Sequence, residues 1–143
     1  EALKLYSAFV EGIDKDTEAF NKVSAAYKLP KNTDEEKATR SAAIREANVG
    51  ATEVPFETVK LCLEGLKVTE TMVGRSNPNA ASDLGVAALN LLAGIRGAWL
   101  NVKINLPGIK DEALKAKFES GAAMVDEAYT LANRIYEEVL ASL

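Results

Sequence analysis

An aspartate at position 16 breaks an apolar helical pattern at the start of the chain. Apolar residues recur there at steps of three, four or seven, the spacing of one helix face; they are Tyr6, Phe9, Ile13, Phe20, Val23 and Tyr27. Asp16 falls on this stripe, so we expect its carboxylate to be at least partly buried. Such a carboxylate can carry protons or stabilise a cation. It can equally be a structural group bonded to a helix backbone or paired with Lys or Arg, and the spacing leaves both interpretations open.

A second set of polar residues shares one face of a later, more apolar stretch. At 100° per residue, one narrow arc holds Asp83, Ala87, Asn90, Gly94, Gly97, Asn101 and Asn105. Glycine inside a helix costs about 1 kcal/mol relative to alanine, so Gly94 and Gly97 need a packing or access reason. The arc is therefore either a close contact between helices or the floor of a ligand groove lined with amides. Packing alone explains the polar members less well, because buried polar groups need partners.

Two cations lie near the expected start of a helix. Lys31 stands in the loop after Pro30, and Arg40 falls in the second turn of the helix that follows. Together they could hold an anionic group, or they could be two solvated surface charges.

The composition excludes several other kinds of chemistry. The chain has 143 residues, no histidine, one cysteine and a net charge of −4. Without histidine there is no Ser-His-Asp triad and no His-ligated zinc, so proton transfer must rely on carboxylates, lysines or tyrosines. The acidic balance argues against nucleic-acid binding. Cys62 has no partner in the chain, which favours a reducing compartment such as the cytoplasm, and no stretch approaches the ~20 apolar residues of a membrane span.

Helical spacing dominates the chain, and it predicts an all-α bundle of about five mostly antiparallel helices. The expected boundaries are a stop at Pro30, a capping box at Thr33 and Glu36, a stop near Gly50, a start at Pro55, a stop at Gly74, a start at Asn77 and Pro78, a break at Pro107 and Gly108, and a cap at Asp111. Residues 84–100 are apolar or small almost throughout, so this helix is expected to be central and the most buried. Trp99 and Cys62 are expected to belong to the core.

Four segments in this order resemble the cyclodeaminase/cyclohydrolase family of folate enzymes. They are Asp14–Phe20, Leu29–Lys37, Asn77–Asp83 and Asn101–Leu106. The family includes the cyclodeaminase half of formiminotransferase-cyclodeaminase and stand-alone bacterial methenyltetrahydrofolate cyclohydrolases, and the stand-alone type looks most similar. The resemblance implies an all-α homodimer, and the family's catalytic aspartate matches Asp16, not Asp14. Family members carry a Gly-rich segment upstream, so residues 1–143 are expected to be a single helical domain that lacks this segment.

The resemblance also implies a reaction on a reduced folate. In the cyclohydrolase direction, water opens the methenyl bridge of methenyltetrahydrofolate to give formyltetrahydrofolate. Alternatively, formiminotetrahydrofolate cyclises to methenyltetrahydrofolate and releases ammonia. Asp16 would stabilise the cation and carry the proton, and Lys31 would contact the anionic part of the substrate. Hydrogen bonds to the pterin or bridge atoms would come from Asp83, Asn101 and Asn105. Neither reaction is redox, so we expect no metal and no organic cofactor. The rival interpretation is a non-catalytic helical dimerisation module, in which Asp16 forms a structural salt bridge; neither interpretation involves nucleic acid or a membrane.

Overall fold

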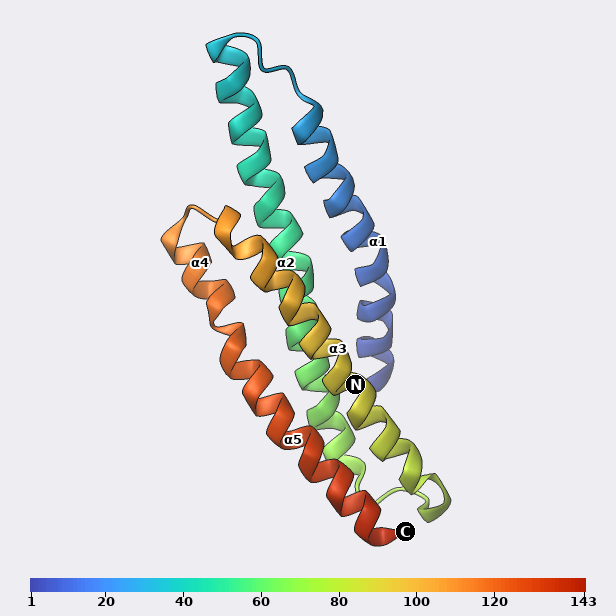
Figure 1. The fold of residues 1–143 in the computed structure, drawn as a ribbon. Helices are drawn as coiled ribbons and strands as arrows, with labels where there is room; N and C mark the ends of the chain where they lie inside the picture. The colour runs from blue at the N-terminus through green and yellow to red at the C-terminus, as the bar shows by residue number, and fades with distance from the viewer.

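The computed structural model describes residues 1–143, and it contains helices without any strand. Four long helices and one short one form the bundle: α1 (Ala2–Lys28), α2 (Asp34–Met72), α3 (Ala81–Asn105), the short α4 (Glu112–Glu119) and α5 (Gly121–Ser142). Two 3-10 turns, η1 (Pro78–Ala80) and η2 (Leu106–Gly108), flank α3. Figure 1 shows α1 and α3 running in one direction and α2 and α5 in the other. The all-α class is confirmed, but the predicted division into five helices is wrong at two places.

The first error is the boundary expected between Gly50 and Pro55, because α2 runs through both residues. Proline has no N–H, so the carbonyl four residues earlier, that of Ala51, loses its helical donor. The side-chain nitrogen of Asn105 donates to the Ala51 oxygen at 3.0 Å. This bond from α3 replaces the missing one, and α2 can continue for 39 residues.

The second error is the single final helix, which divides at Ser120 into α4 and α5. The first residue of α5, Gly121, lies against two aromatic rings. A β-carbon at Gly121 would come within 2.7 Å of Trp99 Cζ3 and 3.3 Å of Phe56 Cε2. The interruption therefore coincides with a close approach that only glycine allows.

The helix ends that the capping residues predicted are confirmed. The Thr33 hydroxyl accepts a hydrogen bond from the Glu36 N–H, and the Glu36 carboxylate accepts one from the Thr33 N–H, which completes the capping box. The Asp111 carboxylate accepts from the N–H of Leu114 at the start of α4. Gly74, just after α2, has a φ of +69°, a value that favours glycine.

The central helix of the bundle is α2, so the expectation that α3 is the most buried helix is wrong. Nine residues of α2 are buried against five of α3, and α2 packs against α1, α3 and α5. On α3 the face with Ile95 and Val102 is fully buried, whereas Leu100 and Ile104 are exposed. The apolar composition of α3 thus covers both a core face and a solvent face.

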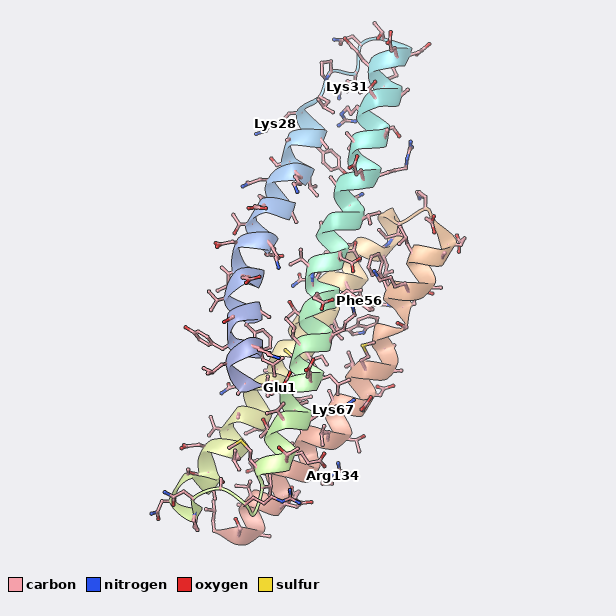
Figure 2. All side chains as sticks on the ribbon, turned by 180° about the vertical axis from the view of Figure 1, so that it is seen from behind. Glu1, Lys28, Lys31, Phe56, Lys67 and Arg134 are labelled. Atoms are coloured by element: carbon pink, nitrogen blue, oxygen red, sulfur yellow. The ribbon has the colours of Figure 1, made fainter.

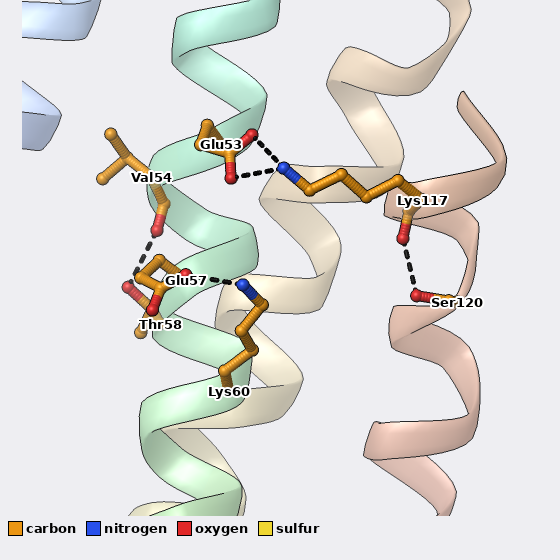
Figure 3. A network of polar contacts seen from close by, with 7 residues as sticks. All are labelled: Glu53, Val54, Glu57, Thr58, Lys60, Lys117 and Ser120. Carbon is orange, nitrogen blue, oxygen red and sulfur yellow. Dashed lines mark hydrogen bonds and ion pairs between the residues drawn. The ribbon is translucent and has the colours of Figure 1, made fainter. Parts of the chain in front are cut away.

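The core has a main cluster that joins α2, α3 and α5 and a smaller one near α4. In the smaller cluster the rings of Phe56 and Phe118 meet edge to face, with their centroids 5.4 Å apart. Cys62 is buried and Trp99 packs against both clusters, as predicted. The Lys117 ammonium ties α4 to α2 by contacting both carboxylate oxygens of Glu53 at 2.7 and 2.8 Å (Figure 3).

The segment Pro78–Gly108 has the length and mean hydropathy, 1.2 in its most apolar window, that a membrane-crossing helix requires. This corrects the expectation that no stretch approaches such a span. Core helices of bundles have the same composition, and α3 packs against both α2 and α5.

Helix α1 has two apolar faces, and its buried residues do not lie on the predicted stripe, although Phe9 of that stripe packs against the main core cluster. Its buried residues are Leu5, Ala19 and Ala26, and the two alanines let α1 approach α2 closely. On the predicted stripe, Ile13 is 67% and Phe20 is 71% exposed. Asp16 is exposed as well, so the expectation that its carboxylate is partly buried is wrong.

Candidate functional site

Asp16 lines an open cleft of about 410 Å³ between α1, α2 and α3, which we call the Asp16 cleft. Asn101 lies on the α3 side of the same cleft. The apolar walls come from Phe9, Ile13, Val54, Pro55 and Ala98. The volume is within the range of small-molecule sites, which combine apolar walls with a few polar groups.

The polar groups of the Asp16 cleft differ in whether they already have partners. The Thr17 hydroxyl donates to the Ile13 carbonyl at 3.1 Å, and the Thr58 hydroxyl donates to the Val54 carbonyl at 3.2 Å (Figure 3). Asp16 takes part in none of the six ion pairs of the chain, and neither its carboxylate nor the Asn101 amide has a side-chain hydrogen bond. Both groups are therefore free to bind a ligand. No three His, Cys, Asp or Glu side chains come together as ligands for a metal ion.

Two glycines shape the cleft from opposite sides. A β-carbon at Gly12 of α1 would meet no atom within 4 Å, whereas one at Gly94 of α3 would lie 3.2 Å from the Cys62 sulfur. Gly94 therefore serves both suggested purposes, because it lets α3 approach α2 and also lines the cleft. Burial raises the pKa of the Cys62 thiol to about 11, so the thiol stays protonated near neutral pH and is a poor nucleophile.

The other residues predicted on the α3 face do not join Asp16 and Asn101. Asp83 lies in the first turn of α3, eighteen residues from Asn101, which corresponds to about 27 Å along a helix. Asn105 lies one turn beyond Asn101, and its amide nitrogen is bonded to Ala51. A shared arc gives a shared face, but it does not place residues at the same height.

Lys31 lies in a different cavity, of about 500 Å³, at the projecting end of the α1–α2 hairpin (Figure 2). We call it the cationic pocket, because it is lined by Lys31, Lys37, Arg40, Arg45 and Lys110 and by no carboxylate. The Arg40 guanidinium donates to the Tyr27 carbonyl at 3.2 Å and lies 5.4 Å from the centre of the Tyr27 ring.

Three cations of this pocket were not predicted from the sequence: Lys37, Arg45 and Lys110. Lys37 and Arg45 lie within a turn or two of Arg40 on α2, and this helical spacing could have indicated both. Lys110 follows η2, far away in the sequence, and no local pattern connects it with Arg40.

A larger groove, of about 700 Å³, lies along the opposite face of α1 between α1 and α2. Alanines and Gly50 form much of its lining, and charged side chains stand among them. It contains none of the predicted site residues, and one of its carboxylates, that of Glu53, is paired with Lys117. Its other two carboxylates, those of Glu18 and Glu46, are in no ion pair. The smaller Asp16 cleft is the better candidate for chemistry because it brings the predicted Asp16 of α1 and Asn101 of α3 together within apolar walls.

A model of the formiminotransferase-cyclodeaminase family matches residues 1–124, which include Asp16, Lys31 and Asn101. The chain belongs to this family. The resemblance found in the sequence is thereby confirmed.

Two relatives from the family carry different names. A methenyltetrahydrofolate cyclohydrolase of Methylorubrum extorquens is 44% identical over 128 residues, which make up 89% of this chain and 62% of that protein. A formimidoyltransferase-cyclodeaminase of Sus scrofa is 34% identical over 128 residues, or 24% of its own length. The chain thus spans about three-fifths of the first relative and about a quarter of the second.

A solved structure also matches the fold of this family member. It is a formiminotetrahydrofolate cyclodeaminase from Thermotoga maritima, with a TM-score of 0.72 and 26% sequence identity. The match covers 98% of this chain and 64% of the solved chain. The same bundle therefore occurs in a protein described as a cyclodeaminase.

Proposed function

We propose that the chain acts as a methenyltetrahydrofolate cyclohydrolase, which adds water to methenyltetrahydrofolate and yields formyltetrahydrofolate. The observation that carries the proposal is the unpartnered carboxylate of Asp16, which shares an apolar-walled cleft with the unpartnered amide of Asn101. Membership of the family and the 44% identical cyclohydrolase support the substrate class. A non-catalytic module would have Asp16 in a structural salt bridge, and the chain has no such pair.

The chemistry suits a carboxylate in an apolar cleft. The methenyl carbon lies between two nitrogens and shares their positive charge, which the Asp16 carboxylate stabilises. As a water oxygen bonds to this carbon, Asp16 accepts a proton from the water and later returns it to the nitrogen whose bond to carbon breaks. The second proton of the water is released to solvent as the remaining hydroxyl becomes the formyl C=O. The electron pair of that bond stays on the nitrogen, so the reaction involves no net redox change and the proposal includes no cofactor. The Asn101 amide can both donate to and accept from the polar edge of the pterin.

The second candidate is formiminotetrahydrofolate cyclodeaminase. It is favoured by the cyclodeaminase name of the solved structure that shares the fold and of the Sus scrofa relative. Here one folate nitrogen attacks the formimino carbon, ammonia leaves, and the same methenyl cation forms as product. The methenyl absorbance distinguishes the two activities, because it disappears in hydrolysis and appears in cyclodeamination.

The test compares Asp16→Asn with the matched variant Asp14→Asn in the active protein. Asp14 is exposed on the opposite side of α1 and does not line the cleft. We expect Asp16→Asn to lower kcat by about 10²-fold or more, while Asp14→Asn retains activity and both variants keep the helical circular dichroism spectrum. Activity near that of the wild type in Asp16→Asn would remove this residue from the mechanism.

We also propose that the protein is a homodimer that works in the cytoplasm. Val86, Leu100 and Ile104 of α3 are exposed at 55%, 71% and 77%, and they lie on one side of that helix at spacings of fourteen and four residues. Such an apolar face is suited to a partner. Sedimentation of Leu100→Lys tests this, with a shift to monomer as the expected result. The single free thiol of Cys62 agrees with a reducing compartment.

A further inference from the structure

The Asp16 cleft and the cationic pocket lie on the same side of the α1–α2 hairpin. Val54 lines the first and Arg40 lines the second. These residues are fourteen positions apart on α2, which corresponds to about 21 Å. A reduced folate in its extended form has a pterin, an aminobenzoyl and a glutamyl group joined end to end, and it is long enough to reach between the two sites.

Two aromatic residues of α1, Phe20 and Tyr27, lie between the two sites, and we call them the aromatic path. Asp16, Phe20 and Tyr27 follow one another at steps of four and seven, so they lie on one face of the helix. The rings are 71% and 54% exposed, although aromatic side chains of this size are more commonly buried. Tyr27 contacts Arg40 through both its carbonyl and its ring, and Arg40 belongs to the cationic pocket.

Helix α3 also leads from the Asp16 cleft toward the cationic pocket, across the cleft from α1. It runs parallel to α1 (Figure 1), and Asn101 on it lines the Asp16 cleft. The chain then continues through η2 to Gly108 and Lys110, which both line the cationic pocket. The residues that follow Asp16 along α1 and the residues that follow Asn101 along α3 and η2 therefore both lead to the cationic pocket.

The charge of the cationic pocket is unusual for this chain. Five of the 17 Lys and Arg residues line it without any carboxylate, although the chain as a whole carries a charge of −4. Of the five, Lys37 alone is in an ion pair, with the exposed Asp34. Such a pocket attracts a group with more than one negative charge, and the glutamyl end of a folate carries two carboxylates.

We propose that the folate lies lengthwise on the bundle, with its pterin in the Asp16 cleft, its aromatic ring beside Phe20 and Tyr27, and its glutamyl carboxylates in the cationic pocket. This orientation rests on the proposed folate substrate. It makes Arg45 and Lys110 residues that select substrates by the charge of their tail, and it makes Phe20 a positioning residue.

The test measures equilibrium binding of two ligands to the full chain: tetrahydrofolate, and tetrahydropteroate, which lacks the glutamyl group. We expect the wild type to bind tetrahydrofolate about tenfold more tightly, and added salt to reduce this preference. The double variant Arg45→Gln/Lys110→Gln should lose the preference, because tetrahydrofolate binding weakens while the dissociation constant of tetrahydropteroate stays within about twofold. Lys4→Gln removes an exposed cation of α1 that lies outside both sites, and it should keep the preference.

A second variant separates the aromatic path from the charges. Phe20→Ala should weaken both ligands by about tenfold, whereas Val10→Ala, on another side of α1 and also exposed, should weaken neither. Equal binding of the two ligands to the wild type, equal loss of both in the double variant, or no binding of either overturns the proposed orientation. Turnover of methenyltetrahydrofolate is measured separately, so a wrong orientation with turnover leaves the proposed function intact. The preference without turnover leaves the orientation intact and removes the proposed reaction.

Discussion

Filling the Asp16 cleft from its α1 wall should separate activity from stability. Gly12 lines the cleft one turn before Asp16, and a β-carbon there meets no atom within 4 Å. The substitution Gly12→Leu therefore adds a side chain to the space beside the carboxylate, and its β-carbon clashes with no atom of the folded chain.

The two expected effects have opposite signs. Leucine is a better helix former than glycine by about 0.5–1 kcal/mol, which for a domain of this size raises the melting temperature by about 2–4 °C. A ligand forced against the new side chain in a cleft of about 410 Å³ loses about 1–3 kcal/mol, by analogy with overpacked cores. This corresponds to a fall in kcat/KM of about fivefold to 150-fold.

The matched control is Gly50→Leu on α2. A β-carbon at Gly50 also meets no atom within 4 Å, and this glycine lines neither the Asp16 cleft nor the cationic pocket. Thermal unfolding followed by circular dichroism should show both variants to be as stable as the wild type or more so. The methenyl absorbance assay should show a loss in Gly12→Leu alone. Full activity in Gly12→Leu would mean that the substrate binds elsewhere, and an equal loss in both variants would mean that the effect is not local to the cleft.

Three further predictions concern what holds the helices in place. Asn105→Ala leaves the Ala51 carbonyl without its donor and should lower the free energy of unfolding in urea by about 1–2 kcal/mol. In a Pro55→Ala background, where the helical N–H is restored, the loss should be smaller. An equal loss in both backgrounds would argue that the Asn105 bond does not replace the missing helical bond. Thr33→Ala removes the capping box and should cost about 1 kcal/mol in the same assay, whereas Thr39→Ala at an exposed position of α2 should not. The pKa of Cys62 is raised from 9.0 to about 11 in the folded chain, so folding favours the protonated thiol. The free energy of unfolding should therefore be unaffected by this group below pH 9 and should fall by about 2–3 kcal/mol as the pH rises to 11. In Cys62→Ala the free energy of unfolding should change less with pH over this interval, and identical pH dependence in the two proteins would contradict the shift.

The sequence predicts where most helices end, because capping is a local property. Thr33, Gly74 and Asp111 each act within a few residues of their own position. Pro55 misleads for the same reason: a proline is a signal of a helix start, and nothing near it in the sequence reveals that Asn105 will supply the lost hydrogen bond. The break at Gly121 is equally hidden, since it depends on the ring of Trp99 from another helix.

The candidate site shows a similar limit. Periodicity finds Asp16 and Asn101 as polar residues on otherwise apolar or small-residue faces, and the cleft contains both. It cannot choose between two apolar faces of α1, and the face with small side chains lies against α2 while Phe20 stays exposed. Nor does it give height along a helix, so Asp83 shares a face with Asn101 without sharing its cavity.

Among the four long helices, the one that carries Asp16 has the weakest attachment to the rest of the bundle. It has three buried residues, whereas α2 has nine, and it packs mainly against α2 while α2, α3 and α5 share the main core. Segments with few buried contacts open in partial unfolding well before the whole chain does. Amide hydrogens of α1 should therefore exchange faster than those of α2, and the proposed active centre should come apart at a denaturant concentration that the three-helix core still withstands. Catalysis would then report on the docking of one helix, a quantity that a melting temperature does not measure.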